Sequence, residues 1–204
     1  MMRRLVFLLI GLVIVPGLAV AARPAQGLAA NEVLRGQFVQ ERHLKGFNAP
    51  LRTEGRFVLA PSHGLIWRAE KPFAVDTVIT PAGLAQQVDG TQTLRLESSK
   101  LPFLARLYDM LSGALAGNWS RLESDFTVSR SGDAQNWQVT MLPRKADDIA
   151  MPFRSIAVTG SRFVDTVVLS KPDGDSDVLT FIDQSVSNAP LSAAETAAFA
   201  TATQ

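Results

Sequence analysis

Hydrophobic and polar residues alternate along much of this chain, and the alternation is clearest in its second half. In the segments 121–128 and 136–141, apolar residues such as Phe126, Val128 and Trp137 alternate with charged, amide or hydroxyl residues. A period of two gives one apolar and one polar face, as in half-buried antiparallel strands. Strands are also expected within 56–59, 65–69, 93–97, 163–169 and 178–182.

Turn-forming residues separate these runs at short intervals. Clusters of Pro, Gly, Asn, Asp and Ser occur at 48–50, 61–64, 89–90, 131–133 and 172–174. Segments of helical length do not alternate with the strands, which argues against a parallel sheet built from βαβ units. We therefore expect an α+β protein whose main element is a meander of about ten antiparallel strands, and a sheet that wide tends to curl.

A few segments show a helical pattern instead. In 101–116 the apolar residues recur at helical spacing, with Pro102 near the first turn and Gly117 at the end. Ser192 and Glu195 form the sequence signature of a capping box before a second helix. A short helix within 27–37 and a single turn near 147–150 are weaker expectations.

The chain has too little helix to cover both faces of a curled sheet. We therefore expect an incompletely covered, concave apolar surface with 101–116 as a lid, which makes a lipid-sized cavity. The alternative for 101–116 is an ordinary packing helix, and the alternation leaves open whether Trp67 and Trp137 belong to the core or to the cavity wall. The residues expected to line the cavity and its lid are Phe38, Phe57, Leu65, Trp67, Leu94, Leu96, Leu104, Leu107, Tyr108, Leu111, Leu115, Phe126, Trp137 and Met141.

The first 21 residues have the pattern of a cleaved export signal. Arg3 and Arg4 precede an apolar run that is short for a membrane-spanning helix, and 19–21 reads Ala-Val-Ala, the small-x-small pattern of a signal-peptidase site. We expect residues 1–21 to be removed and residues 22–204 to form a single exported domain.

Composition removes several classes of function. The chain of 204 residues has a formal charge of +1 and no basic run, which argues against a nucleic-acid partner. It has no Cys and two His, so thiolate metal sites and Cys nucleophiles are excluded and a His-based site is improbable. The carboxylates of 173–177 lack the Gly and Glu of a calcium loop and predict a hairpin turn. We expect neither an enzyme nor a cofactor or metal site.

The residues also resemble a known family. Phe38-x-Gln40, Gly55-x-Phe57 and Pro61-x-x-Gly64-Leu65-Ile66-Trp67 followed by Pro72 carry the likeness, together with Pro50-Leu51, Ile79-Thr80, Gly83-Leu84 and Asn188-x-Pro190-Leu191. In this order they are similar to LolA, the periplasmic lipoprotein carrier, and its relatives. The resemblance implies a strongly curved antiparallel half-barrel with helices over its concave apolar face, in which Trp67 points inward.

The same resemblance implies a function. Carriers of this family take the acyl chains of lipoproteins from an inner-membrane transporter and release them to an outer-membrane acceptor, here as a periplasmic monomer. The family commonly has Arg before the proline of this motif, where it helps to hold the lid, but this chain has Ala60. A lipid other than a lipoprotein is therefore an alternative cargo. A periplasmic module that senses lipids or lipoproteins without transporting them is the alternative function.

Overall fold

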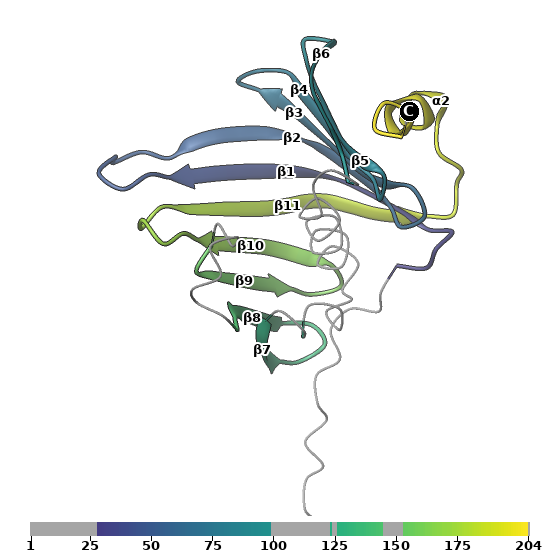
Figure 1. Cartoon of the computed structure of the whole chain (residues 1–204). Helices are drawn as coiled ribbons and strands as arrows, with labels where there is room; N and C mark the ends of the chain where they lie inside the picture. Colours follow the sequence, from purple (N-terminus) through teal and green to yellow (C-terminus); the bar gives the residue numbers. More distant parts are fainter. Residues whose placement is uncertain (1–27, 99–122, 124–125, 145–152, 204) are drawn as a thin grey trace, which may run out of the picture.

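Eleven antiparallel strands form one sheet in the computed structural model, which describes residues 28–98, 123, 126–144 and 153–203 (Figure 1). Along the sheet the order is β6-β5-β4-β3-β2-β1-β11-β10-β9-β8-β7, so the first and last strands meet in the middle and the sheet stays open. The strands are β1 (Val33–His43), β2 (Leu51–Ala60), β3 (Gly64–Lys71), β4 (Val75–Ile79), β5 (Gly83–Val88), β6 (Thr91–Glu97), β7 (Phe126–Gly132), β8 (Trp137–Pro143), β9 (Ser155–Gly160), β10 (Val164–Ser170) and β11 (Ser176–Ser187).

The strands follow the alternation of the sequence, with one clear exception at the start. The wide antiparallel sheet is confirmed, with eleven strands rather than about ten, and the 173–177 turn is the hairpin between β10 and β11. The expected single meander is instead two meanders, β1–β6 and β7–β11, which are joined by the pairing of β1 with β11, so that β6 and β7 lie at opposite edges. The short helix expected within 27–37 is wrong, because β1 begins at Val33. Val33 and Leu34 are both buried, but they belong to the clusters on opposite faces of the sheet. Only a strand sends two consecutive side chains to opposite faces in this way.

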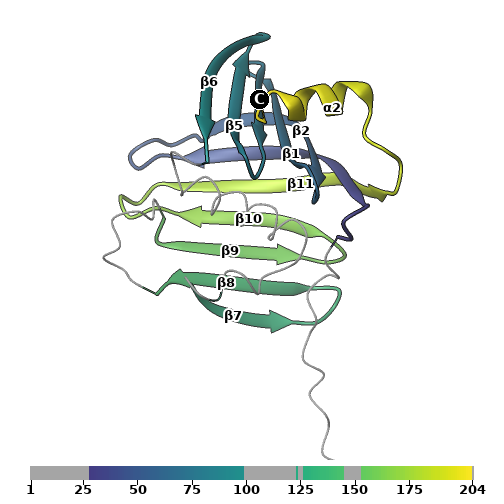
Figure 2. The same ribbon diagram turned by 45° about the vertical axis from the view of Figure 1, so that its right-hand side comes forward.

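The sheet bends strongly toward one of its faces. Two strands lie between β3 and β11, so their side chains would be about 14 Å apart on a flat sheet. The ring centroids of Trp67 on β3 and Phe181 on β11 are in fact 6.1 Å apart. Side chains converge in this way only on the inside of a curve, so this face is the concave one. Figures 1 and 2 show the consequence: β3–β6 run across the direction of β1 and β7–β11.

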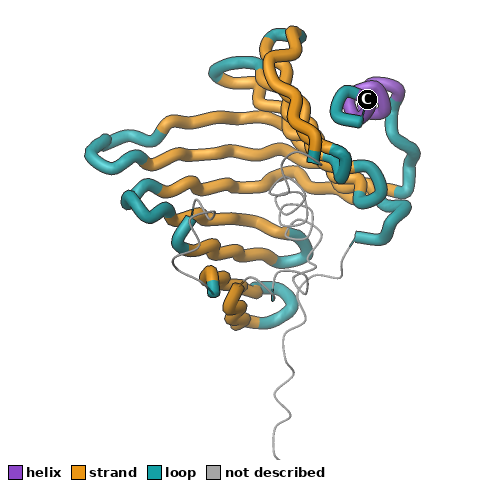
Figure 3. The backbone as a smooth tube through the Cα atoms, in the orientation of Figure 1, coloured by secondary structure: helices purple, strands orange, loops and turns teal. Residues whose placement is uncertain are grey.

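Helix α2 (Ala193–Ala200) packs on the opposite, convex face, beside β3 and β4 (Figure 3). Its Phe199 contacts a cluster that includes Ile66 and Val78, which point away from the concave face. The capping box of Ser192 and Glu195 is confirmed. Helices over the concave face were expected, but the helix found among the described residues covers the other face; the segments 101–116 and 147–150 lie outside those residues. No described helix is long and apolar enough to cross a membrane.

Two glycines allow aromatic rings to lie against neighbouring strands on the concave face. Gly160 is the cross-strand partner of Trp137, and Gly36 is the partner of Phe57. A Cβ atom added to Gly160 would lie 2.2 Å from Trp137 Cζ2, and one added to Gly36 would lie 2.7 Å from Phe57 Cε1. Neither distance is compatible with a side chain, so both aromatic rings depend on the missing Cβ of the partner strand.

We expect Gly160→Ala to lower the free energy of unfolding by about 1–3 kcal/mol, because the new methyl group must displace the buried Trp137 ring. Chemical denaturation followed by circular dichroism measures the change. Thr159→Ala, at an exposed position of the same strand, is the control and is expected to change stability by less than about 0.5 kcal/mol. Equal stability of Gly160→Ala and the wild type would show that the ring does not need this space.

Candidate functional site

The concave face gathers all the described residues of the predicted cavity. Pairing register places nine of them on this one face: seven belong to the buried concave cluster or pack against it, and Leu94 and Leu96 are linked to Trp67 and Leu65 through directly opposite residues of β5 and β4. Leu104, Leu107, Tyr108, Leu111 and Leu115 lie outside the described residues. The nine are Phe38, Phe57, Leu65, Trp67, Leu94, Leu96, Phe126, Trp137 and Met141.

Stacked aromatic rings form the centre of this face. The rings of Phe38 and Trp67 are stacked with centroids 3.7 Å apart, and Phe57 meets Phe181 edge to face at 5.3 Å. Phe38 and Phe57 are fully buried, but Trp67 is only half-buried. Trp137 is 3% exposed and its indole N–H donates to the carbonyl of Ser161, so it is a core residue. Trp67 therefore sits where the packed centre meets accessible surface.

The concave face is partly uncovered at its edge strand β6. Leu94 is 40% exposed and Leu96 is half-buried, although both point to the same side as Trp67. Other members of the buried cluster were not predicted from the sequence, among them Phe153, Ile156, Val158, Val164 and Phe181. The signal that was available for Phe181 and Val164 is the apolar pattern of 163–169 and 178–182, which was used to predict strands but not to select a face.

Polar side chains replace apolar ones at one end of the concave face. Asp177 is 6% exposed and accepts bonds of 2.8 Å from Arg42 Nε and from Lys171 Nζ. Burial alone raises the pKa of Asp177, but the hydrogen bonds from Lys171 and Arg42 outweigh it and lower this pKa below its ordinary value. A pocket of about 150 Å³ adjoins this group and is lined by Gln40, Arg42, Leu51 and Thr53.

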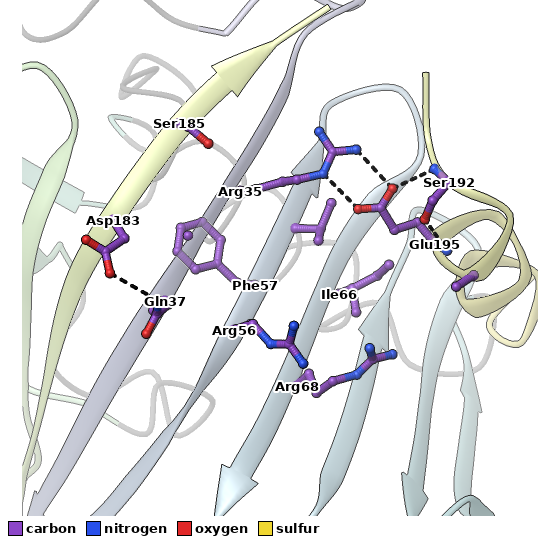
Figure 4. Close-up of a pocket in the computed structure, with 13 residues that line it drawn as sticks. Arg35, Gln37, Arg56, Phe57, Ile66, Arg68, Asp183, Ser185, Ser192 and Glu195 are labelled. Carbon is purple, nitrogen blue, oxygen red and sulfur yellow. Dashed lines mark hydrogen bonds and ion pairs between the residues drawn. The ribbon is translucent and has the colours of Figure 1, made fainter. Parts of the chain in front are cut away.

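A larger pocket of about 350 Å³ lies on the convex face beside the start of α2 (Figure 4). Arg35 closes one side of it: Nε and Nη2 of Arg35 donate to the two carboxylate oxygens of Glu195 at 2.8 and 2.9 Å. The backbone N–H of Ser192 donates to the same carboxylate. Chiefly through the hydrogen bond from Arg35, the pKa of Glu195 falls from 4.5 to about 2.

The two other arginines of the convex pocket also have carboxylate partners outside its lining. Arg56 pairs with Glu70, and Arg68 pairs with Asp76 at 2.8 Å. Their charges are therefore already balanced, and Val58 and Ile66 supply the apolar part of the lining. The pocket lies where α2 meets the sheet, and the Arg35–Glu195 pair fixes this contact.

The other residues that the sequence singled out, which are the two histidines and Ala60, occupy structural positions. His43 ends β1 and is exposed, and the ring of His63 lies 5.8 Å from that of Phe199 on the convex side. Ala60, which stands where the resemblance expects Arg, is 3% exposed and packs in the convex cluster with Phe199. The described residues contain no group of three or more His, Cys, Asp or Glu side chains placed to hold a metal ion.

We expect Glu195→Gln to reduce the free energy of unfolding by about 1–2 kcal/mol at pH 7, because Arg35 keeps its charge but loses its carboxylate partner and one of two acceptor oxygens. The folded pKa is depressed, so this contribution is complete above about pH 4.5 and disappears as the pH falls toward 2. Denaturation of both proteins across this range should show the gap closing. Glu41→Gln, in a more exposed pair with Arg52, is the control. A gap independent of pH would contradict the assignment.

A known protein family matches most of this chain. The family model described as "Outer membrane lipoprotein carrier protein LolA-like" matches residues 19–201. No curated protein is significantly similar to the chain.

Several solved structures are similar to this one. A LolA superfamily protein from Nitrosomonas europaea is 9% identical, with 78% of this chain and 87% of that chain covered and a TM-score of 0.42. The Pseudomonas aeruginosa MucA/MucB complex is 14% identical, with 79% of this chain and 54% of that chain covered and a TM-score of 0.37. LprF from Mycobacterium bovis is 11% identical, with 80% of this chain and 89% of that chain covered and a TM-score of 0.37. Because the family model spans most of its length, this chain belongs to the LolA-like family of outer-membrane lipoprotein carrier proteins.

Proposed function

We propose that this protein binds the acyl chains of a lipoprotein or another lipid on its concave face and carries them across the periplasm, without catalysis. The observation that carries the proposal is the convergence of aromatic and aliphatic side chains from eight strands on one face of an open sheet. Membership of the LolA-like family supports the same function. In this proposal an inner-membrane transporter loads the carrier, which acts as a monomer after loss of residues 1–21, and an outer-membrane acceptor unloads it.

The free energy of moving an acyl chain from water explains why such a carrier needs a segment of its own that competes with cargo for the concave face. Each buried methylene contributes about 0.8 kcal/mol, so a 16-carbon chain transferred from water gains about 12 kcal/mol. A carrier that gained all of this would not release its cargo. In our proposal the leucine-rich segment 101–116, which the sequence predicts to be a helix, occupies the concave face when cargo is absent. Cargo must then displace it, and the net affinity falls.

Trp67 offers a direct test of where the chain binds. Because it is half-buried at the centre of the concave face, we expect a lysophospholipid with a brominated 16- to 18-carbon chain to quench its fluorescence. All three proteins carry Trp119→Phe, which removes the third Trp of the chain. In this background Trp67→Phe should bind the same lipid, as measured by native mass spectrometry, but lose most of the quenching. Trp137→Phe removes an indole from the packed core and is the matched control, which should keep the quenching.

Absence of both lipid binding and quenching in the wild type would refute the carrier function. Binding with unchanged quenching in Trp67→Phe would place the acyl chain elsewhere. Turnover of lipid esters by the purified protein would contradict a carrier without catalysis.

The lack of Cys makes the proposed displacement measurable. A spin label on Leu107→Cys should become more mobile when lipid is added, because the cargo takes the place of 101–116. A label on Ser129→Cys, at an exposed position of β7, is the control and should not respond. An unchanged spectrum at position 107 in a protein shown to be saturated with lipid would refute the competition.

A further inference from the structure

The change from apolar to charged residues along the concave face follows the pairing of β1 with β11. Three consecutive concave pairs run from the centre to one end: Phe38 with Phe181, Gln40 with Leu179, and Arg42 with Asp177. The face is thus aromatic at its centre, mixed at the next pair and ionic at the last. A molecule that is apolar along its length and charged at its end matches this order.

The charges at this end do not cancel. Asp177 is shared by Arg42 and Lys171, so one carboxylate serves two cations. Arg154 adds a third cation near Lys171, since its Nη2 donates to the carbonyl of Pro172 at 3.3 Å. The adjoining turn brings two further acids, Asp173 and Asp175, which accept the backbone N–H groups of Asp175 and Lys45 and keep their negative charges. The side chain of Lys45 lies beside the same turn, so four cations meet three carboxylates and one positive charge remains.

Arg42 is shared between Asp177 and open space. Its Nε is the atom bound to Asp177, its side chain is 48% exposed, and its terminal nitrogens have no acceptor among the described residues. The adjoining pocket of about 150 Å³ adds the hydroxyl of Thr53 and the amide of Gln40, which donates one N–H to Asp177 at 3.5 Å and keeps a second. Leu51, 60% exposed, supplies an apolar wall. Guanidinium, amide and hydroxyl donors around a small pocket are suited to an oxyanion.

We propose that the lipid carried by this protein has an anionic headgroup, which binds at Arg42 and Lys171 while the acyl chain lies on the concave face. Asp177 holds Arg42 and Lys171 in place, and the charged groups at this end together leave one unit of positive charge for the cargo. A zwitterionic headgroup brings its own cation to the same end of the face, where it meets like charge. The inference rests on the proposed function and adds the class of cargo to it.

Two single-chain lipids with the same 16-carbon chain separate the headgroup from the chain. We expect the delipidated wild type to bind lysophosphatidylglycerol about tenfold more tightly than lysophosphatidylcholine, measured by equilibrium dialysis below the micelle concentration. In Arg42→Gln and in Lys171→Gln this preference should fall below about threefold, while binding of lysophosphatidylcholine is unchanged. Arg52→Gln is the matched control, because Arg52 lies on the same hairpin, points to the convex face and pairs with Glu41 and Glu54.

The outcomes distinguish the headgroup proposal from the carrier function. Equal binding of the two lipids by the wild type, or a preference that survives both substitutions, overturns the headgroup site and leaves acyl binding intact. Binding of neither lipid refutes the proposed function itself. Saturable heat from inorganic phosphate alone in a titration would assign the cluster to a free anion and overturn the lipid headgroup. Lys171→Gln keeps the Arg42–Asp177 pair, so the test stands even if Arg42→Gln is unfolded.

Discussion

The bend of the sheet is the constraint on which the rest of this structure depends. It brings Trp67 on β3 to within 6.1 Å of Phe181 on β11, across two intervening strands. Burial of these rings compensates for the bending, and the glycines opposite Phe57 and Trp137 let the rings lie flat against neighbouring strands. Without the bend, the apolar side of an open eleven-strand sheet would be a flat surface exposed to water or to another sheet.

The two faces of the sheet have different kinds of interaction. On the convex face, α2 is fixed by Phe199 in a small apolar cluster and by the bidentate Arg35–Glu195 pair. On the concave face, contacts come from aromatic and aliphatic side chains, and exposure increases toward Leu94 at the edge. Specific polar bonds suit a permanent joint because they need a fixed geometry. Non-directional apolar contacts suit a face that has to accept a flexible chain and then give it up.

In the proposed carrier, affinity and selectivity are separated along the concave face. The apolar centre contributes binding free energy in proportion to the area that an acyl chain buries, and this contribution hardly depends on which lipid carries the chain. The Arg42–Asp177–Lys171 group lies at the end of the same face, where a headgroup would be. Charge there changes which lipid is preferred more than how strongly an acyl chain is held. A carrier built in this way can keep moderate affinity and still choose its cargo.

The sequence by itself determined the antiparallel strands, their hairpin turns, the capping box and the face to which most apolar residues point, because these depend on local alternation and local turn chemistry. Tertiary structure decided what depends on distant partners: that Val33 begins a strand rather than continuing a helix, that α2 packs on the convex face, and that Trp137 is core while Trp67 is half-buried. It also decided that Arg42 and Asp177, 135 positions apart, meet on one face. The pairing of the first strand with the last produces that contact, and no local sequence pattern predicts which distant strands will pair.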